Sequence, residues 1–191
     1  MRLSNRLILA SGSPRRKQLL QDAGFDFEVK TVPFEEVFPE DMASEKVAEF
    51  LAIGKNEAHR KALENELIIL TADTVVVFND QILGKPKDER EAINTLNLLS
   101  GEIHDVITGV CISLLELQHS FSCKTQVKFK SLSDKEIKLY VENYKPMDKA
   151  GSYAIQEWIG LIGIEWINGS YYNVVGLPVH EVYQLLKDKF S

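Results

Sequence analysis

The segment that most constrains this chain is Leu67–Phe78, an apolar run with one acidic residue in its middle. Ile, Val and Thr dominate the run and Asn79-Asp80 follows it, which predicts a strand buried on both faces that ends in a tight turn. An ionised carboxylate among aliphatic side chains costs several kcal/mol without a partner. We therefore expect Asp73 to face a metal, a cation or a cleft. The alternative is that Asp73 ends the strand early and caps a turn, although Val75–Val77 continue the strand pattern.

The second informative feature is the junction between a short apolar strand over residues 7–10 and the helix predicted after it. Ser13 is placed as the helix cap and Pro14 as the first helical residue. Free backbone N–H groups and the positive end of the helix dipole make such a junction an anion site. Arg15 and Arg16 lie in the first turn, against the dipole, which favours a negatively charged partner. The alternative is that both arginines are merely solvated.

Three further charged positions are candidates for the same chemistry. Lys55 lies beside the apolar stripe of a helix predicted over residues 44–63, where a lysine usually extends its amine into solvent. Glu35 and Glu36 follow a proline and are either a solvated rim or metal-binding carboxylates; the sequence alone favours the rim. Lys85 lies between a flexible glycine and a rigid proline, a setting that fixes the direction of its ammonium group better than a helix surface would.

The second half of the chain is richer in strands. Residues 104–115 and 121–130 predict a long antiparallel hairpin. The segment over residues 147–156 is expected to be a loop that feeds a strand. Gln156 follows this small, apolar strand, and its amide either reads the hydrogen-bonding edge of a planar ligand or completes the sheet. Helices and strands alternate earlier in the chain. The fold class we predict is therefore α/β, with a mixed twisted sheet and helices on both faces.

Composition limits the organisation and the partners of the chain. The 191 residues are 45% hydrophobic, which predicts one domain over residues 1–191, with one or two lobes. The net charge of −6 argues against a general binder of nucleic acid or membrane surfaces, which needs a broad basic face. The apolar runs of the chain are too short for a signal peptide or a membrane span, so we expect a cytoplasmic protein. Cys111 and Cys123 are expected to be thiols rather than a disulfide.

An ordered series of short motifs spans nearly the whole chain. The motifs are Ser11-Gly-Ser-Pro-Arg-Arg16, Ala72-Asp-Thr74, Gly84-Lys-Pro86, Ser100-Gly-Glu-Ile-His104, Thr108-Gly-Val110, Asp148-Lys-Ala-Gly-Ser-Tyr153, Ile155-Gln156 and Asn173-Val-Val-Gly-Leu-Pro178. Each is weak by itself, but the full series at compatible spacing is specific. Together they resemble the Maf family of nucleoside triphosphate pyrophosphatases.

This resemblance implies a fold, a reaction and a cofactor. The fold is two-lobed and mixed α/β, similar to that of inosine triphosphate pyrophosphatases, with a cleft between the lobes and often a homodimer. The reaction is hydrolysis of a nucleoside triphosphate to the monophosphate and pyrophosphate with a divalent cation, Mg²⁺ or Mn²⁺. By position in the motifs, Asp73 corresponds to the proton acceptor and, together with Glu36, to a metal ligand.

The resemblance also implies how the phosphates are bound. The phosphate-binding cations correspond to Arg15 or Arg16, Lys55 and Lys85. Ser13 joins this set because the helix start that follows it offers backbone N–H donors.

Substrate choice is implied by Arg15, Thr74 and Gln156, which match the trio of the branch that resembles dTTP/UTP pyrophosphatases. The branch that acts on methylated guanosine triphosphate differs at these positions. The chain departs from the family pattern at Glu157, where glycine is frequent, and at Asn56, where alanine is frequent.

Two other functions remain open from the sequence. One is a house-cleaning pyrophosphatase for non-standard purine or methylated guanosine triphosphates. The other is a nucleotide-binding regulator of cell division with little turnover.

Overall fold

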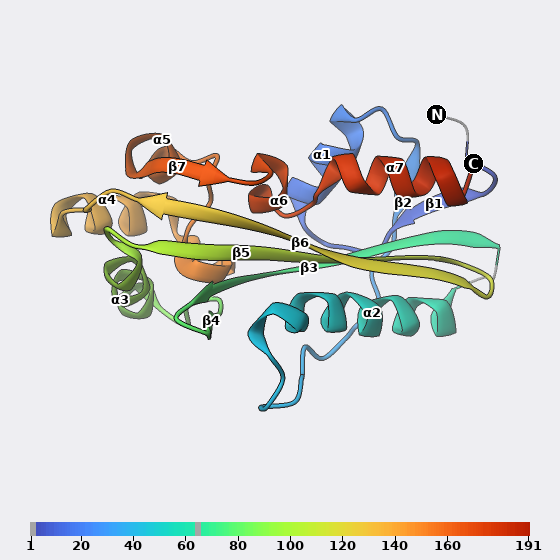
Figure 1. The fold of residues 1–191 in the computed structure, drawn as a ribbon, viewed down its shortest axis with the longest axis horizontal. Coiled ribbons are helices and arrows are strands. Elements are labelled where there is room, and N and C mark those ends of the chain that lie inside the picture. The colour runs from blue at the N-terminus through green and yellow to red at the C-terminus, as the bar shows by residue number, and fades with distance from the viewer. Residues whose placement is uncertain (1–2, 64–65) are drawn as a thin grey trace. The chain divides into compact units, whose positions relative to one another are not determined.

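The computed structural model describes residues 3–63 and 66–191, which form a mixed α/β fold (Figure 1). The chain divides into two compact units. The first comprises residues 1–73, 108–123 and 176–191, and the second comprises residues 74–107 and 124–175. Met1-Arg2, which belong to the amino-terminal run predicted not to be a signal peptide, lie outside the described residues.

Within the described residues, seven strands form one sheet in the order β2-β1-β3-β5-β6-β7, and β4 pairs with β3. The strands are β1 (Arg6–Leu9), β2 (Phe27–Val29), β3 (Leu67–Phe78), β4 (Gln81–Leu83), β5 (Ile103–Leu114), β6 (Leu117–Phe129) and β7 (Ile164–Asn168). Strand β1 runs parallel to β2 and β3, whereas the pairs β3·β4 and β6·β7 are antiparallel. The predicted mixed sheet is therefore confirmed.

Helices flank this sheet. They are α1 (Pro14–Asp22), α2 (Ser44–Ala62), α3 (Glu89–Leu99), α4 (Asp134–Tyr144), α5 (Trp158–Gly163), α6 (Tyr171–Val175) and α7 (Val179–Lys189), with short 3₁₀ turns η1 (Pro146–Asp148) and η2 (Ala150–Ser152). None of the helices within residues 3–63 and 66–191 has the length and hydropathy of a membrane span.

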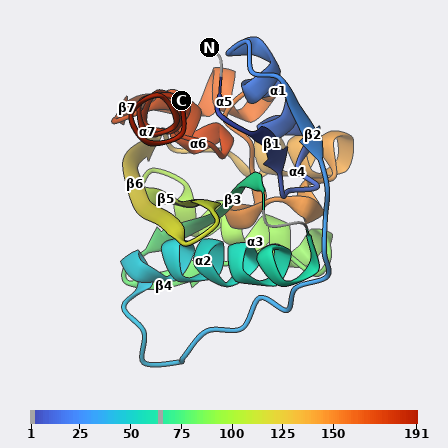
Figure 2. The same cartoon turned by 90° about the vertical axis from the view of Figure 1, so that its right-hand side faces the viewer.

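The first unit buries its strands on both faces. Figures 1 and 2 show α2 on one face of the strands and α1 with α7 on the other. Leu9 of β1 packs in one cluster with Leu20 of α1 and Val182 of α7, while its neighbour Ile8 packs in a separate cluster with Ile69 of β3. Alternate residues thus enter different cores, which explains why these strands read as unbroken apolar runs.

Helix α2 is held on its strands by buried polar contacts. The Asn56 amide donates to the carbonyl of Ile69 at 2.9 Å, and the Thr71 hydroxyl of β3 donates to the carbonyl of Ala52 at 2.7 Å. A Cβ on Gly109 of β5 would lie 2.2 Å from the backbone nitrogen of Glu49, so only glycine permits this approach of strand to helix. Through its bond to Ile69, Asn56 fixes the register of α2 on the sheet. This is the position at which the family frequently has alanine.

The second unit contains a core of its own. Leu96 of α3, Phe129 of β6 and Tyr140 of α4 are fully buried in one cluster. Strand β3 turns into β4 through Asn79 and Asp80, whose φ angles of 49° and 61° confirm the predicted tight turn.

The prediction of a strand before Gln156 is wrong. Residues 153–156 follow η2 as irregular backbone and a turn that leads into α5. Gly151 has φ of +67°, which breaks the extended path, and the amide of Glu157 bonds to the carbonyl of Ala154 at 3.1 Å. Gln156 consequently lies in a turn and is exposed.

The two cysteines are free thiols, as predicted. Burial raises the pKa of Cys111 to about 12, so this thiol stays protonated at neutral pH. Cys123 is half-buried, and burial likewise raises its pKa.

Candidate functional site

Asp73 is a buried carboxylate within β3 and is 8% exposed. Its Oδ1 forms an ion pair with Nζ of Lys55, which comes from α2. The prediction that Asp73 faces a cation is confirmed. The alternative that it ends the strand is wrong, because β3 continues to Phe78.

Lys55 does not extend into solvent, so the expectation for its amine is wrong. Its side chain is 15% exposed, and Nζ contacts Asp73 and also Oε1 of Glu36 at 2.6 Å. Two carboxylates compensate for the water that the ammonium loses on burial. The close approach of α2 to the sheet is what brings this side chain to Asp73.

Glu36 was predicted to be either part of a solvated rim or a metal-binding carboxylate, and it has features of both. Its side chain is 44% exposed, as a solvated rim predicts, yet it forms the ion pair with Lys55. The loop that carries it is attached to α2 beside this pair. The ring of Phe34 packs over Gly54, where a Cβ would lie 2.7 Å from the ring.

His59 provides the second attachment of this loop. The backbone N–H of Val32 donates to Nε2 of His59 at 3.0 Å, so Nδ1 carries the ring hydrogen and donates to the carbonyl of Lys55 at 2.7 Å. One buried imidazole therefore links the loop of Glu36 to the helical turn of Lys55. Sequence reasoning missed His59; its signal was the spacing of four residues from Lys55, which places both on one helical face.

The first turn of α1 forms as predicted. Ser13 caps the helix by accepting a hydrogen bond from the amide of Arg16 at 3.4 Å. The Arg16 guanidinium donates through Nε to the carbonyl of Gly176 at 2.8 Å and through Nη1 to the Ser11 hydroxyl at 3.2 Å. Ser11 and Gly176 orient this arginine, and the sequence assigned neither of these two residues a role.

Arg16 lies in the electrostatic field of the two carboxylates. The pKa of Arg16 is lowered, mainly by burial and to a smaller extent by the neighbouring charge of Arg15. The negative charges of Asp73 and Glu36 oppose this shift. The guanidinium is also held by its hydrogen bonds to the carbonyl of Gly176 and the hydroxyl of Ser11. The alternative that Arg16 is simply solvated is therefore wrong, and Arg15 beside it is half-buried.

These residues define a carboxylate–cation cluster within the first unit, made of Asp73, Glu36, Lys55, Arg15 and Arg16. Three positive and two negative side chains leave one net positive charge. The helix start after Ser13 adds backbone donors. Such a cluster is suited to binding a polyanion beside a carboxylate.

The predicted metal ligands, Asp73 and Glu36, are both carboxylates. Among residues 3–63 and 66–191, no group of three or more His, Cys, Asp and Glu side chains is arranged to hold a metal. Asp73 and Glu36 nevertheless converge on one point, the Lys55 ammonium. Mg²⁺ is usually bound through one or two carboxylates with substrate phosphates and water. The two carboxylates therefore fit a metal that binds together with a phosphorylated substrate.

Three predicted site residues belong to the second unit. Thr74 directly follows Asp73 and is half-buried, while Lys85, just after β4, is exposed, as is Gln156. A hydrogen bond of 3.2 Å from the amide of Gly151 to the carbonyl of Gly84 joins the two segments that carry Lys85 and Gln156.

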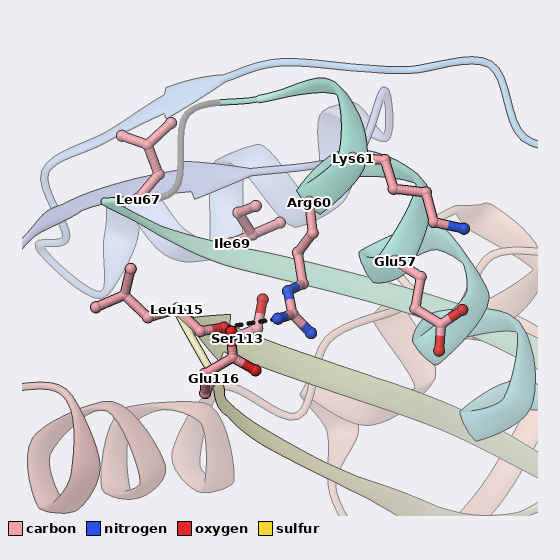
Figure 3. Close-up of a pocket in the computed structure, with 8 residues that line it drawn as sticks. All are labelled: Glu57, Arg60, Lys61, Leu67, Ile69, Ser113, Leu115 and Glu116. Carbon is pink, nitrogen blue, oxygen red and sulfur yellow. Dashed lines mark hydrogen bonds between the residues drawn. The ribbon is translucent and has the colours of Figure 1, made fainter.

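A pocket in the first unit is distinct from the cluster (Figure 3). The residues lining it are Glu57, Arg60, Lys61, Leu67, Ile69, Ser113, Leu115 and Glu116. The Arg60 guanidinium points across it and donates to the carbonyl of Leu115 at 2.7 Å. None of the predicted site residues lines this pocket, so we assign it no part in the candidate site.

The link through His59 leads to a direct test. His59→Asn removes the acceptor at the Nε2 position, whereas His59→Gln places a carbonyl oxygen near it. Losing a hydrogen bond worth about 0.5–1.5 kcal/mol should speed amide exchange at Val32 about two- to tenfold in the asparagine variant. Hydrogen exchange measured by NMR checks this, with His180→Asn as a control because His180 is exposed on α7. Equal exchange at Val32 in all variants would contradict the link.

Comparison with known proteins agrees with the motifs. The family model described as Maf-like protein matches residues 6–189. A dTTP/UTP pyrophosphatase of Phocaeicola vulgatus is 50% identical over 183 residues, which are 95% of this chain and 95% of the relative. One of Christiangramia forsetii is 48% identical over 188 residues, which are 98% of this chain and 96% of the relative.

Two solved structures match about two thirds of this chain. A dITP/XTP pyrophosphatase of Mycobacterium abscessus is 14% identical with a TM-score of 0.41, covering 66% of this chain and 75% of that one. A HAM1 protein of Coxiella burnetii is 12% identical with a TM-score of 0.42, covering 65% of this chain and 73% of that one. The match of the family model to residues 6–189, together with relatives 48% and 50% identical over nearly the full chain, shows that this protein belongs to the Maf family.

Proposed function

We propose that this protein is a nucleoside triphosphate pyrophosphatase that hydrolyses dTTP and UTP, and modified pyrimidine triphosphates, to the monophosphate and pyrophosphate. The observation that carries the proposal is the buried carboxylate of Asp73, which is paired with Lys55 and lies within electrostatic reach of Arg16. The substrate is supported by the relatives named dTTP/UTP pyrophosphatase, which are 44% to 50% identical to this chain.

Asp73 is the proposed proton acceptor. Its carboxylate is oriented by the ion pair with Lys55 and held on a strand that cannot shift without disturbing two cores. In the proposed reaction, Asp73 positions a water molecule, takes a proton from it and directs it at the α-phosphorus. The bond from the α-phosphorus to the bridging oxygen breaks, and pyrophosphate leaves.

The cations of the cluster lower the cost of bringing a nucleophile to a triphosphate, which carries about four negative charges. Lys55 has three N–H donors, of which two point to carboxylates, and the third serves a phosphate oxygen. Arg15 and Arg16 bind further oxygens together with the helix start after Ser13. Lys85 is proposed as an additional phosphate ligand on the strength of its motif.

Asp73 and Glu36 are the proposed ligands of a divalent cation, Mg²⁺ or Mn²⁺. The bound cation supplies charge neutralisation at the phosphate oxygens. Glu36 suits this role because its exposed side chain can move from Lys55 to an incoming metal with little cost in packing.

The remaining assignments stay predictions. Arg15, Thr74 and Gln156 are proposed to select the base and sugar, following their match to the dTTP/UTP branch. Action as one domain over residues 1–191, cytoplasmic localisation and a homodimer are likewise part of the proposal.

The role of Asp73 is tested by Asp73→Asn, which keeps the shape of the side chain and its contact to Lys55. We expect turnover to fall about a hundredfold or more, the usual size of a general-base effect, while nucleotide affinity changes little. Pyrophosphate release with Mg²⁺ and calorimetric binding measure the two quantities. Asp26→Asn is the control, because Asp26 is exposed and lies outside the cluster. Turnover at the wild-type rate in Asp73→Asn would remove Asp73 from this role.

Substrate choice is tested by competing dTTP, UTP, dITP and methylated GTP in one assay. We expect the two pyrimidine nucleotides to have the highest kcat/KM. A purine that wins by tenfold, about 1.4 kcal/mol of transition-state discrimination, would replace the pyrimidine assignment. Binding without release of pyrophosphate from any of the four would favour the regulator.

A further inference from the structure

Gln156 is presented by a short, firmly held turn in the second unit. The turn Ala154–Glu157 is closed by the hydrogen bond of 3.1 Å from the amide of Glu157 to the carbonyl of Ala154. Ile155 is buried at 7% exposure, whereas Gln156 next to it is exposed. The backbone of the turn is thus anchored in the core while the amide side chain of Gln156 is left accessible.

One buried hydroxyl holds both ends of this turn. Tyr140, which is fully buried on α4, accepts a hydrogen bond from the amide of Ala154 at 3.2 Å. The same hydroxyl donates to Oε2 of Glu157. Because Ala154 and Glu157 flank the turn on either side, the Tyr140 hydroxyl fixes both its entry and its exit.

The charge on Glu157 is balanced within the same group of residues. Lys149 is 7% exposed, and its Nζ lies 3.4 Å from Oε1 of Glu157 and 2.7 Å from Oδ1 of Asp148. Burial first, and then the hydrogen bond to Glu157, raise the pKa of Tyr140, so its hydroxyl remains a donor at neutral pH. The polar groups that hold the turn therefore satisfy one another.

Helix α5 braces the turn from its other side. A Cβ on Gly160 would lie 1.8 Å from the carbonyl oxygen of Ile155, so the helix backbone rests directly on the turn. The amide of Gly160 also bonds to the carbonyl of Glu157 at 2.9 Å. The peptide that precedes Gln156 thus has little room to move.

We propose that the Tyr140 hydroxyl is a positioning group that sets Gln156 for hydrogen bonding to the edge of a pyrimidine base. A glutamine amide offers one donor and one acceptor side, which match the carbonyl and N–H of a uracil or thymine ring. An exposed glutamine reads such an edge well only when its backbone is held to within about 0.5 Å. This inference rests on the proposed function, and it adds the group that holds the reading residue in place.

The test is Tyr140→Phe, which removes the hydroxyl and keeps the buried ring. We expect kcat/KM for dTTP to fall about tenfold, mainly through a higher KM, because a loosened Gln156 weakens binding of the base. In a Gln156→Ala background the same substitution should change kcat/KM less than twofold, since the residue it positions is gone. Tyr144→Phe is the matched control, an exposed tyrosine on the same helix.

A second readout does not depend on activity. Amide exchange at Ala154 should speed up about two- to tenfold in Tyr140→Phe and stay unchanged in Tyr144→Phe. If Tyr140→Phe does not fold, Glu157→Ala removes the carboxylate that accepts from the Tyr140 hydroxyl. It is then compared in the same way, alone and combined with Gln156→Ala.

The outcomes separate the inference from the proposed function. An active wild type in which Tyr140→Phe and Gln156→Ala act additively overturns the positioning role and leaves the proposed function intact. Unchanged exchange at Ala154 overturns the hold on the turn. Wild-type protein that releases no pyrophosphate from dTTP overturns the proposed function, and the role in reading the base is lost with it.

Discussion

The ion pair between Asp73 and Lys55 is the contact on which the candidate site depends. It joins the centre of a strand that is buried on both faces to a helix packed over that strand. The buried Asp73 carboxylate is tolerated because it forms an ion pair with Lys55. The Lys55 ammonium is tolerated because it also forms an ion pair with Glu36. The folded core and the chemistry of the site therefore use the same side chains.

Polar contacts around this pair keep it in register. Asn56 fixes α2 against β3, His59 ties the loop of Glu36 to the turn of Lys55, and Gly176 accepts from Arg16. Each joins segments that are distant in sequence, so the cluster is built from several directions at once. Rigid support of this kind is what a site needs if it is to bind a polyphosphate in one orientation.

Local patterns predicted much of this protein. The strand Leu67–Phe78 and the cap at Ser13 follow from β-branched runs and capping chemistry, which act over a few residues. The position of the Lys55 amine could not be predicted, because Asp73 and Glu36 are 18 and 19 residues away and meet it only in the folded chain. The prediction of a strand before Gln156 was wrong for a related reason. Tyr140, which lies on helix α4, holds that segment in a turn.

The most direct test of the account is to follow the oxygen of the attacking water. Hydrolysis of dTTP in H₂¹⁸O, analysed by mass spectrometry of both products, shows which phosphorus is attacked. If a water molecule activated by Asp73 attacks the α-phosphorus, the label appears in the monophosphate and the pyrophosphate stays unlabelled. Label in the pyrophosphate, or release of labelled orthophosphate, would place the attack at another phosphorus and contradict the mechanism.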